Sequence, residues 1–168
     1  MTHPLVDQLY FTRQEFLRGI ESINDEDGRR RFEPLNSISW IVGHLAWHEQ
    51  LYWLKRAQGE ILLPELNDLA FGKPASTPAL SAMLAAWQKV TQKAEDYLSR
   101  LDTEKLTTFL IINDKPSTQN LGTMLQRLIY HYWYHLGESQ AVRQLLRHKD
   151  LPSYVGDLEI IAPYRPEK

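Results

Sequence analysis

The stretches NSISWIVGHLAWHEQLYW at residues 36–53 and HYWYHLGESQAVRQLL at residues 131–146 decide the fold. In both stretches apolar residues recur at intervals of three and four, the spacing that places side chains on one face of an α-helix. Both stretches are also rich in aromatic residues, which supply rings to a core or a cleft. Each stretch is therefore predicted to lie in a long helix.

Polar residues that can cap a helix set the limits of these two helices. Asn36 or Ser37 can accept a hydrogen bond from a free backbone N–H at the start of the first helix, which we expect over about 37–58. Asn120 can do the same for the second helix, which we expect to continue towards His148.

Two further helices are expected elsewhere in the chain. From Pro4 to about Asn24 apolar residues recur at helical spacing, and a proline is well placed in the first turn of a helix. Thr77 followed by Pro78 supplies a cap and a first-turn residue for another helix, which we expect to end at about Leu101.

The segments between the expected helices contain the residues that break helices. Residues 25–34 and 60–77 include proline and glycine and are predicted to be connections. Residues 102–119 combine TTFLII, whose composition favours a strand, with the turn-like NDKPST, and we expect a long structured loop there. After the last helix, several prolines and Gly156 predict an irregular tail.

Four long helices without an alternating strand pattern predict an all-α protein. Its apolar stripes are best buried around one axis, as a four-helix bundle with long inter-helix loops and an irregular C-terminal tail. A chain of 168 residues suits one compact domain. We expect the bundle domain at residues 1–150 and the tail at residues 151–168.

The composition excludes several classes of function. A formal net charge of −2 argues against a nucleic-acid partner, because phosphate binding requires an excess of Lys and Arg. No uncharged apolar run approaches the ~20 residues that cross a membrane, and charges interrupt the first twenty residues. We therefore expect a cytoplasmic protein without a membrane partner. The chain contains no Cys, so a metal ion would be held by His, Asp or Glu.

Four of the six histidines form two pairs, His44 with His48 and His131 with His135. Residues four apart on a helix share one face, so two imidazoles can point at a common atom. Three neutral imidazoles from two helices would leave a position open for water, as in catalytic zinc sites, and imidazole also suits Ni, Fe and Cu. The structural alternative is that these are hydrogen-bonded core histidines.

Glu138 lies three residues beyond His135 and therefore returns to the same helix face. It could orient a ligand, bind metal or act as a base, or it could pair with Arg127, Arg143 or another charge at the bundle surface. Glu49 is expected to point away from His44.

Other residues near the histidines have structural and functional alternatives. The aromatic residues within a turn of the paired histidines could wall an apolar pocket or could belong to the core: Trp40, Trp47, Tyr130 and Tyr134. For His3 and His148 we favour simple structural roles.

The two quoted stretches together, with the order of four helices, resemble the DinB/YfiT-like family of metal-dependent enzymes. That resemblance implies a four-helix bundle with a divalent metal ion, Zn, Ni or Fe, held by one histidine from the second helix and two from the last. By position these ligands are His44, His131 and His135. His48 is then the extra histidine, and it could be a fourth ligand, a general base or a core residue.

The resemblance also implies an activity. It predicts a hydrolase or a thiol S-transferase that acts on a small molecule, with His48 and Glu138 as the candidate catalytic residues. Because the chain has no Cys, a low-molecular-weight thiol would have to arrive as a cosubstrate. The resemblance further implies a homodimer. The alternatives are a non-catalytic bundle that binds metal or a small molecule, and a helical interaction protein.

Overall fold

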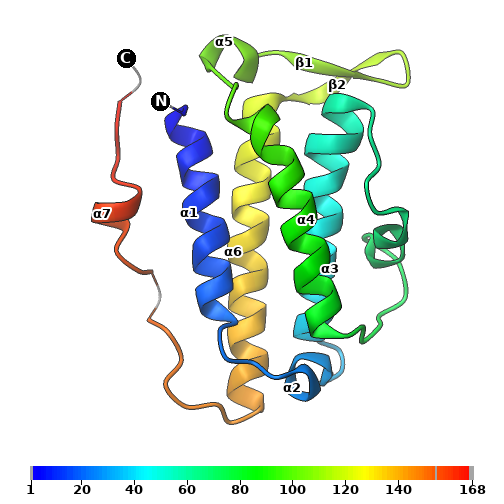
Figure 1. Cartoon of the computed structure of the whole chain (residues 1–168), viewed down its shortest axis with the longest axis vertical. Coiled ribbons are helices and arrows are strands. Elements are labelled where there is room, and N and C mark those ends of the chain that lie inside the picture. Colours follow the sequence, from blue (N-terminus) through cyan, green and yellow to red (C-terminus); the bar gives the residue numbers. More distant parts are fainter. Residues whose placement is uncertain (1, 154, 167–168) are drawn as a thin grey trace.

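A computed structural model describes residues 2–153 and 155–166 and is mostly helical, with one small antiparallel sheet (Figure 1). No helix in this described part is long and apolar enough to cross a membrane. The elements in chain order are α1 (Pro4–Gly19), α2 (Asp25–Arg29), α3 (Ile38–Glu49), the π-helix η1 (Gln50–Arg56), the 3-10 helix η2 (Pro64–Leu69), α4 (Leu80–Leu98), α5 (Thr103–Leu106), β1 (Phe109–Ile112), β2 (Lys115–Asn120), α6 (Leu121–Leu145) and α7 (Leu158–Ile161).

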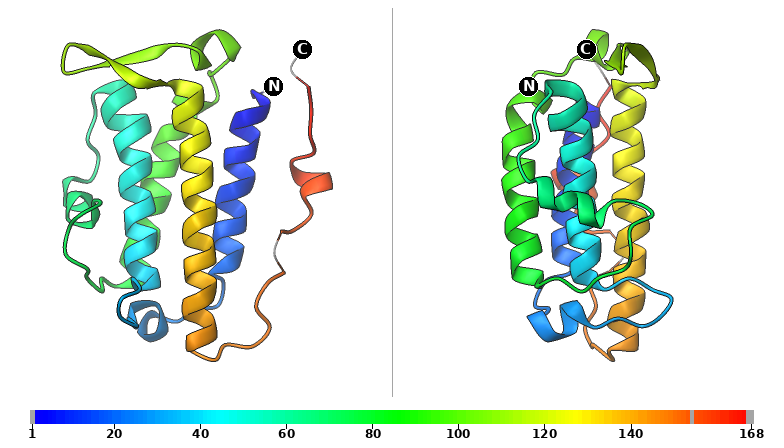
Figure 2. Two further views of the ribbon diagram at one scale, coloured as in Figure 1. Left: turned by 180° about the vertical axis from the view of Figure 1, so that it is seen from behind. Right: turned by 90° about the vertical axis from the view of Figure 1, so that its right-hand side faces the viewer.

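The four longest helical segments of the described chain are α1, α3 with η1, α4 and α6, and they run alongside one another (Figure 1, Figure 2). Helix α3 packs against α4 and α6, and α1 packs against α6. Their inner faces bury the apolar stripes that the spacing predicted, and this burial removes the core from water. Fully buried examples from different helices are Phe16, Ile41, Leu45, Trp53, Val90 and Leu125.

Helix caps explain where three of these helices begin. The Ser37 hydroxyl accepts a hydrogen bond from the Trp40 backbone N–H, and Asn120 caps α6 in the same way. The predicted Thr77–Pro78 start of the third long helix was wrong, because α4 begins at Leu80. Its N-terminus is capped instead by the Asp25 carboxylate, which accepts from the Leu80 N–H at 2.7 Å.

The C-terminal ends of two helices differ from their predicted positions. The first helix ends at Gly19 rather than near Asn24, and Ser22 then takes a positive φ of 64°. The helix expected over 37–58 is α-helical only to Glu49 and continues as the π-helix η1 to Arg56. A π-helix bonds each residue to the fifth after it, and it widens the turn directly after the second histidine of this helix.

Residues 102–119 form short regular elements rather than the single structured loop that we expected. Helix α5 is followed by a β-hairpin in which Phe109 pairs with Asn120 and Ile112 pairs with Lys115. The two residues of its turn, Asn113 and Asp114, both have positive φ, which Asn and Asp tolerate better than most residues. The TTFLII composition thus correctly favoured a strand.

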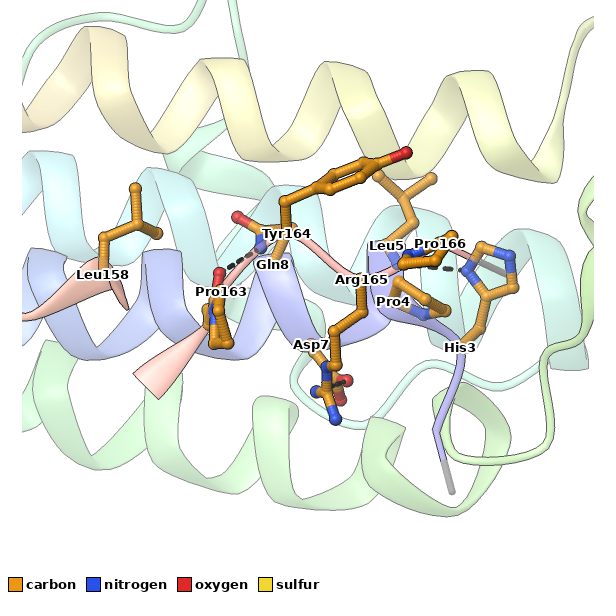
Figure 3. A pocket seen from close by; sticks show the side chains of 11 residues that line it. His3, Pro4, Leu5, Asp7, Gln8, Leu158, Pro163, Tyr164, Arg165 and Pro166 are labelled. Atoms are coloured by element: carbon orange, nitrogen blue, oxygen red, sulfur yellow. Dashed lines mark hydrogen bonds and ion pairs between the residues drawn. The ribbon is translucent and has the colours of Figure 1, made fainter. Parts of the chain in front are cut away.

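The C-terminal segment at residues 155–166 runs beside α1 and includes the short helix α7 (Figure 2). The Gln8 amide donates to the carbonyl of Ala162, and the Glu15 carboxylate accepts from the backbone N–H of Gly156. Between the segment and the start of α1 lies an open cavity of about 480 Å³ (Figure 3), beside which Asp7 and Arg165 form an ion pair.

A buried polar network joins the four long helices. The Arg13 guanidinium of α1 makes two 2.8 Å hydrogen bonds to the Glu49 carboxylate of α3. The Tyr132 hydroxyl of α6 donates to the same carboxylate, and the Trp87 indole of α4 donates to Tyr132. Glu49 is therefore turned into the core and away from His44, as expected.

Candidate metal centre

The two histidine pairs face each other across the interface between α3 and α6. The two helices run in opposite directions (Figure 2), so a step forward along α3 matches a step backward along α6. His44 consequently lies against His135, with ring centroids 5.3 Å apart, and also against His131 at 5.0 Å, while His48 lies against His131 at 4.7 Å. The i, i+4 spacing in each sequence stretch therefore produces two adjacent layers of imidazoles.

Three of these four histidines converge on one point. His44, His131 and His135 each offer a ring nitrogen, and the three nitrogens lie within 4.8 Å of one another. The Nε2 atoms of His131 and His135 are only 2.9 Å apart. In a tetrahedral zinc site with bonds of about 2.0–2.1 Å, two ligand nitrogens lie about 3.3 Å apart. A divalent cation could therefore be held by the cluster if the three nitrogens, which lie within 4.8 Å of one another, move to about that spacing.

The orientation of His44 is fixed by the backbone of η2. Its Nδ1 lies 2.7 Å from the carbonyl oxygen of Leu69, and a carbonyl can only accept, so Nδ1 carries the proton. The Nε2 atom is then unprotonated and available as a ligand. The His44 ring stacks between Trp40 at 4.6 Å and Trp47 at 5.3 Å, which restricts its rotation.

His135 is oriented by a carboxylate. Its Nδ1 donates to the Glu138 carboxylate at 2.8 Å, which leaves Nε2 unprotonated on the side of the cluster. Glu138 also accepts from the backbone N–H of Asn36, so it is itself held in place. A carboxylate that accepts from a ligand histidine is a recurrent feature of protein metal sites. The surface pairing considered for Glu138 is wrong, because Arg127 bonds to Gln119 and Arg143 to Gly19 instead.

His48 contacts the cluster through His131. The Nδ1 atoms of the two rings are 2.7 Å apart, so one ring donates and the other accepts. If His131 binds a cation through Nε2, its proton must sit on Nδ1 and His48 must be the acceptor. His48 is thus placed behind a candidate ligand, and it is outside the group of three nitrogens that could hold one ion.

Burial favours the neutral form of His44, His48 and His131. It lowers the pKa of His44 to about 4, that of His48 to about 3 and that of His131 to about 2. Neutral imidazole is the form that binds metal, so the cluster requires no proton release from these rings at neutral pH. Burial alone would raise the pKa of Glu138. Hydrogen bonds from His135 and Asn36 have the opposite effect and together outweigh burial, so the pKa of Glu138 is lowered overall.

The aromatic residues near the cluster divide into two groups. Trp40 and Trp47 stack on His44, and both also pack in or against the hydrophobic core, so the two alternatives considered for them overlap. Tyr130 and Tyr134 are 67% and 73% exposed, so they are surface residues of α6 rather than buried walls. The ring of Tyr134 lies nearly perpendicular to that of His135, with centroids 5.2 Å apart.

The two remaining histidines lie outside the cluster and have structural roles, as expected. His3 caps α1 by accepting from the backbone N–H of Leu5. His148, beyond the end of α6, bonds to the Asp27 carboxylate at 3.2 Å.

The sequence did not reveal the roles of three residues that hold the histidine cluster or its neighbouring loop in place. Leu69 contributes only a carbonyl, which leaves no mark in the side-chain pattern. Gln50 holds the loop that leads into η2. Its side-chain amide accepts from the N–H groups of Leu62 and Leu63 and donates to the carbonyl of Leu63. Asn36 was considered only as a helix cap, although it also fixes Glu138.

A comparison with protein families finds a match over most of this chain. The model described as the DinB superfamily matches residues 8–139, which include both histidine pairs and Glu138. No curated protein gives a significant match.

Proposed function

The chain belongs to the DinB superfamily, and we propose that it is a metal-dependent enzyme that acts on a small molecule as a hydrolase or a thiol S-transferase. The observation that carries this proposal is the convergence of the His44, His131 and His135 nitrogens within 4.8 Å. We further propose that the four long helices form the four-helix bundle implied by the family resemblance.

His44, His131 and His135 would hold the ion. A set of neutral imidazoles suits Zn, Ni or Fe, and three protein ligands leave a coordination position open. A divalent ion supplies Lewis acidity, which lowers the pKa of a bound water or thiol and makes it a nucleophile at neutral pH. The three histidines provide the nitrogen donors, and the stacked rings of Trp40 and Trp47 restrict the rotation of His44.

We propose positioning roles for the two residues first considered catalytic. Glu138 accepts from His135 Nδ1, and it would hold that ring with Nε2 directed at the ion. His48 would accept from His131 Nδ1 and would have the same effect on that ring. Burial lowers the pKa of His48 to about 3, so it is a weak base, which supports positioning over proton transfer.

Metal content tests the site. Protein purified without an affinity tag should contain about one divalent ion per chain by elemental analysis. The His44→Ala, His131→Ala double variant should lose the ion, whereas His148→Ala should keep it, because His148 lies outside the cluster. Equal metal content in the double variant and the unchanged protein would refute the site.

Turnover tests the enzyme. A panel of activated esters, activated amides and pairs of an electrophile with a small thiol should include a reaction that disappears in the double variant. Hydrolysis without thiol would identify a hydrolase, and dependence on thiol would identify a transferase. A protein that binds the ion but turns over no member of the panel would favour the alternative, a non-catalytic binding module.

The proposed partners follow from this function. They are a small-molecule substrate, a low-molecular-weight thiol if the enzyme is a transferase, and a second copy of the chain in a homodimer. Size-exclusion chromatography with light scattering measures the oligomeric state directly, and a monomeric mass would refute the homodimer.

A further inference from the structure

Beyond the histidines, the helical segment of α3 continues as η1, and α6 leads back to the β-hairpin from which it starts. One turn after His48, the Tyr52 ring makes a T-shaped contact with the imidazole, with centroids 4.2 Å apart. One turn before His131, on the opposite helix, lies Arg127. Arg127 is thus one turn from the ring that contacts His48, because the His131 and His48 ring centroids are 4.7 Å apart. The next turn of η1 brings Arg56 over the Tyr52 ring, with 5.2 Å between the guanidinium carbon and the centroid.

The electrostatic effects of the two arginines agree with this placement. Burial is the main cause of the lowered pKa of His48, and the charges of Arg56 and Arg127 lower it further. Burial raises the pKa of Tyr52, and the same two charges oppose that rise. These effects agree with two arginines on the side of the cluster where His48 and Tyr52 lie, a placement that rests on the ring contacts above.

Neither guanidinium is neutralised by the described part of the chain. Arg56 and Arg127 have no ion-pair partner among residues 2–153 and 155–166, although Arg13, Arg18 and Arg100 each pair with a carboxylate. Arg127 donates to the Gln119 side-chain oxygen, which carries no net charge. Arg56 lies over a neutral ring. Two positive charges therefore remain available beside the histidine cluster.

We propose that Arg56 and Arg127 form a subsite for a carboxylate of the small molecule whose other end reaches His44, His131 and His135. The inference rests on the proposed function and specifies its substrate class. Arginine presents several N–H donors and binds carboxylates through strong charge-assisted hydrogen bonds. Arg127 lies four residues before His131, a rise of about 6 Å along α6, so the carboxylate should lie several ångströms from the group bound at the cluster.

Small probes can separate the carboxylate from the group that binds metal. Mercaptopropionate is compared with mercaptopropanamide for a thiol cosubstrate, and the monohydroxamate of succinate with its amide counterpart for a hydrolysed substrate. Binding to the cobalt-loaded protein is followed by the visible absorption of cobalt, which requires no turnover. The carboxylate should bind about tenfold or more tightly than the amide in at least one pair. The pair that shows this preference identifies which molecule carries the carboxylate.

Variants show whether the two arginines cause the preference. The carboxylate-to-amide affinity ratio should fall towards one in Arg56→Gln and in Arg127→Gln. Arg147→Gln is the matched control, because this exposed arginine lies beyond the opposite end of α6, and it should keep the ratio. Equal affinities for acid and amide in both pairs, or a preference that survives in Arg56→Gln and Arg127→Gln, would overturn the subsite.

Failure of the proposed function gives a different result. A protein that takes up no cobalt lacks the metal site, whatever the arginines do. The same probe pairs are then compared on the metal-free protein by tryptophan fluorescence, because Trp47 packs against both His44 and His48. A carboxylate preference that Arg56→Gln and Arg127→Gln abolish would support the anion subsite alone, and no preference would overturn it.

Discussion

The Nδ1 atoms of His48 and His131 lie 2.7 Å apart, and this contact joins a histidine outside the cluster to one inside it. A hydrogen bond between two ring nitrogens needs one proton, so the protonation of each ring depends on the other. Binding of an ion at His131 Nε2 would place that proton on His131 Nδ1. His48 would then act on the ion only through His131.

Replacing His48 should weaken metal binding without abolishing it. His48→Ala removes the acceptor for His131 Nδ1, and loss of such a partner typically costs about tenfold to hundredfold in metal affinity. His48→Gln keeps a side-chain acceptor and should lose less. Competition with a coloured chelator measures both affinities, with His148→Ala as the control. Complete loss of the ion would make His48 a ligand, and an unchanged affinity would make it a core residue.

Glu138 should matter through His135. Glu138→Ala leaves the His135 Nδ1–H without its acceptor, and metal affinity should fall by about tenfold to hundredfold. Glu138→Gln retains an oxygen that can accept from His135, so it should recover much of the loss. Chelator competition again gives the affinities. If Glu138→Gln binds metal as weakly as Glu138→Ala, the carboxylate acts by another route, such as direct coordination.

The metal-free protein should lose stability in mild acid. His44, His48 and His131 have lowered pKa values of about 4 to about 2, against the ordinary value of 6.5. The unfolded chain therefore binds more protons than the folded chain below about pH 6.5, and the free energy of unfolding falls as the pH falls towards those lowered values. Above about pH 6.5 these groups are neutral in both states and contribute no slope.

Urea denaturation in the presence of a chelator measures this dependence. The free energy of unfolding should decrease steadily from about pH 6.5 to about pH 4. His48→Phe removes one of the three groups and should give a shallower slope. A stability that does not change across this range, or an equal slope in the variant, would contradict burial as the cause of neutrality.

The Arg13–Glu49 pair should be important for stability because both side chains are buried. Arg13→Met leaves the Glu49 carboxylate buried without its cation, which typically costs about 3–5 kcal/mol in free energy of unfolding. The double variant Arg13→Met, Glu49→Leu removes both charges and should be less destabilised than the single variant. Urea denaturation of the three proteins provides the comparison. A double variant that is no more stable than Arg13→Met would refute this explanation.

Local chemistry made the main helices and the histidine layers predictable. Ser37 and Asn120 cap their own helices, so the start of each is encoded within three residues of the cap. The i, i+4 histidine pairs likewise follow from the helix period, and the family resemblance then selected His44, His131 and His135, the three that come within 4.8 Å.

Features that depend on distant parts of the chain were not predictable. The cap of α4 comes from Asp25, which is 55 residues away, and the local Thr77 suggested a different start. The partner of His44 is a backbone carbonyl at Leu69, and backbone acceptors are present at every residue. The contact between His48 and His131 required the register of two helices that are 83 residues apart.

The coordination shell of the bound ion tests the central claim most directly. X-ray absorption spectroscopy of the zinc-loaded protein should show three imidazole nitrogens at about 2.0–2.1 Å and an additional light atom that is not imidazole. His48→Ala should keep all three imidazoles, and His131→Ala should lose one of them or the whole ion. Four imidazoles in the unchanged protein, or three that fall to two in His48→Ala, would contradict a site built from His44, His131 and His135.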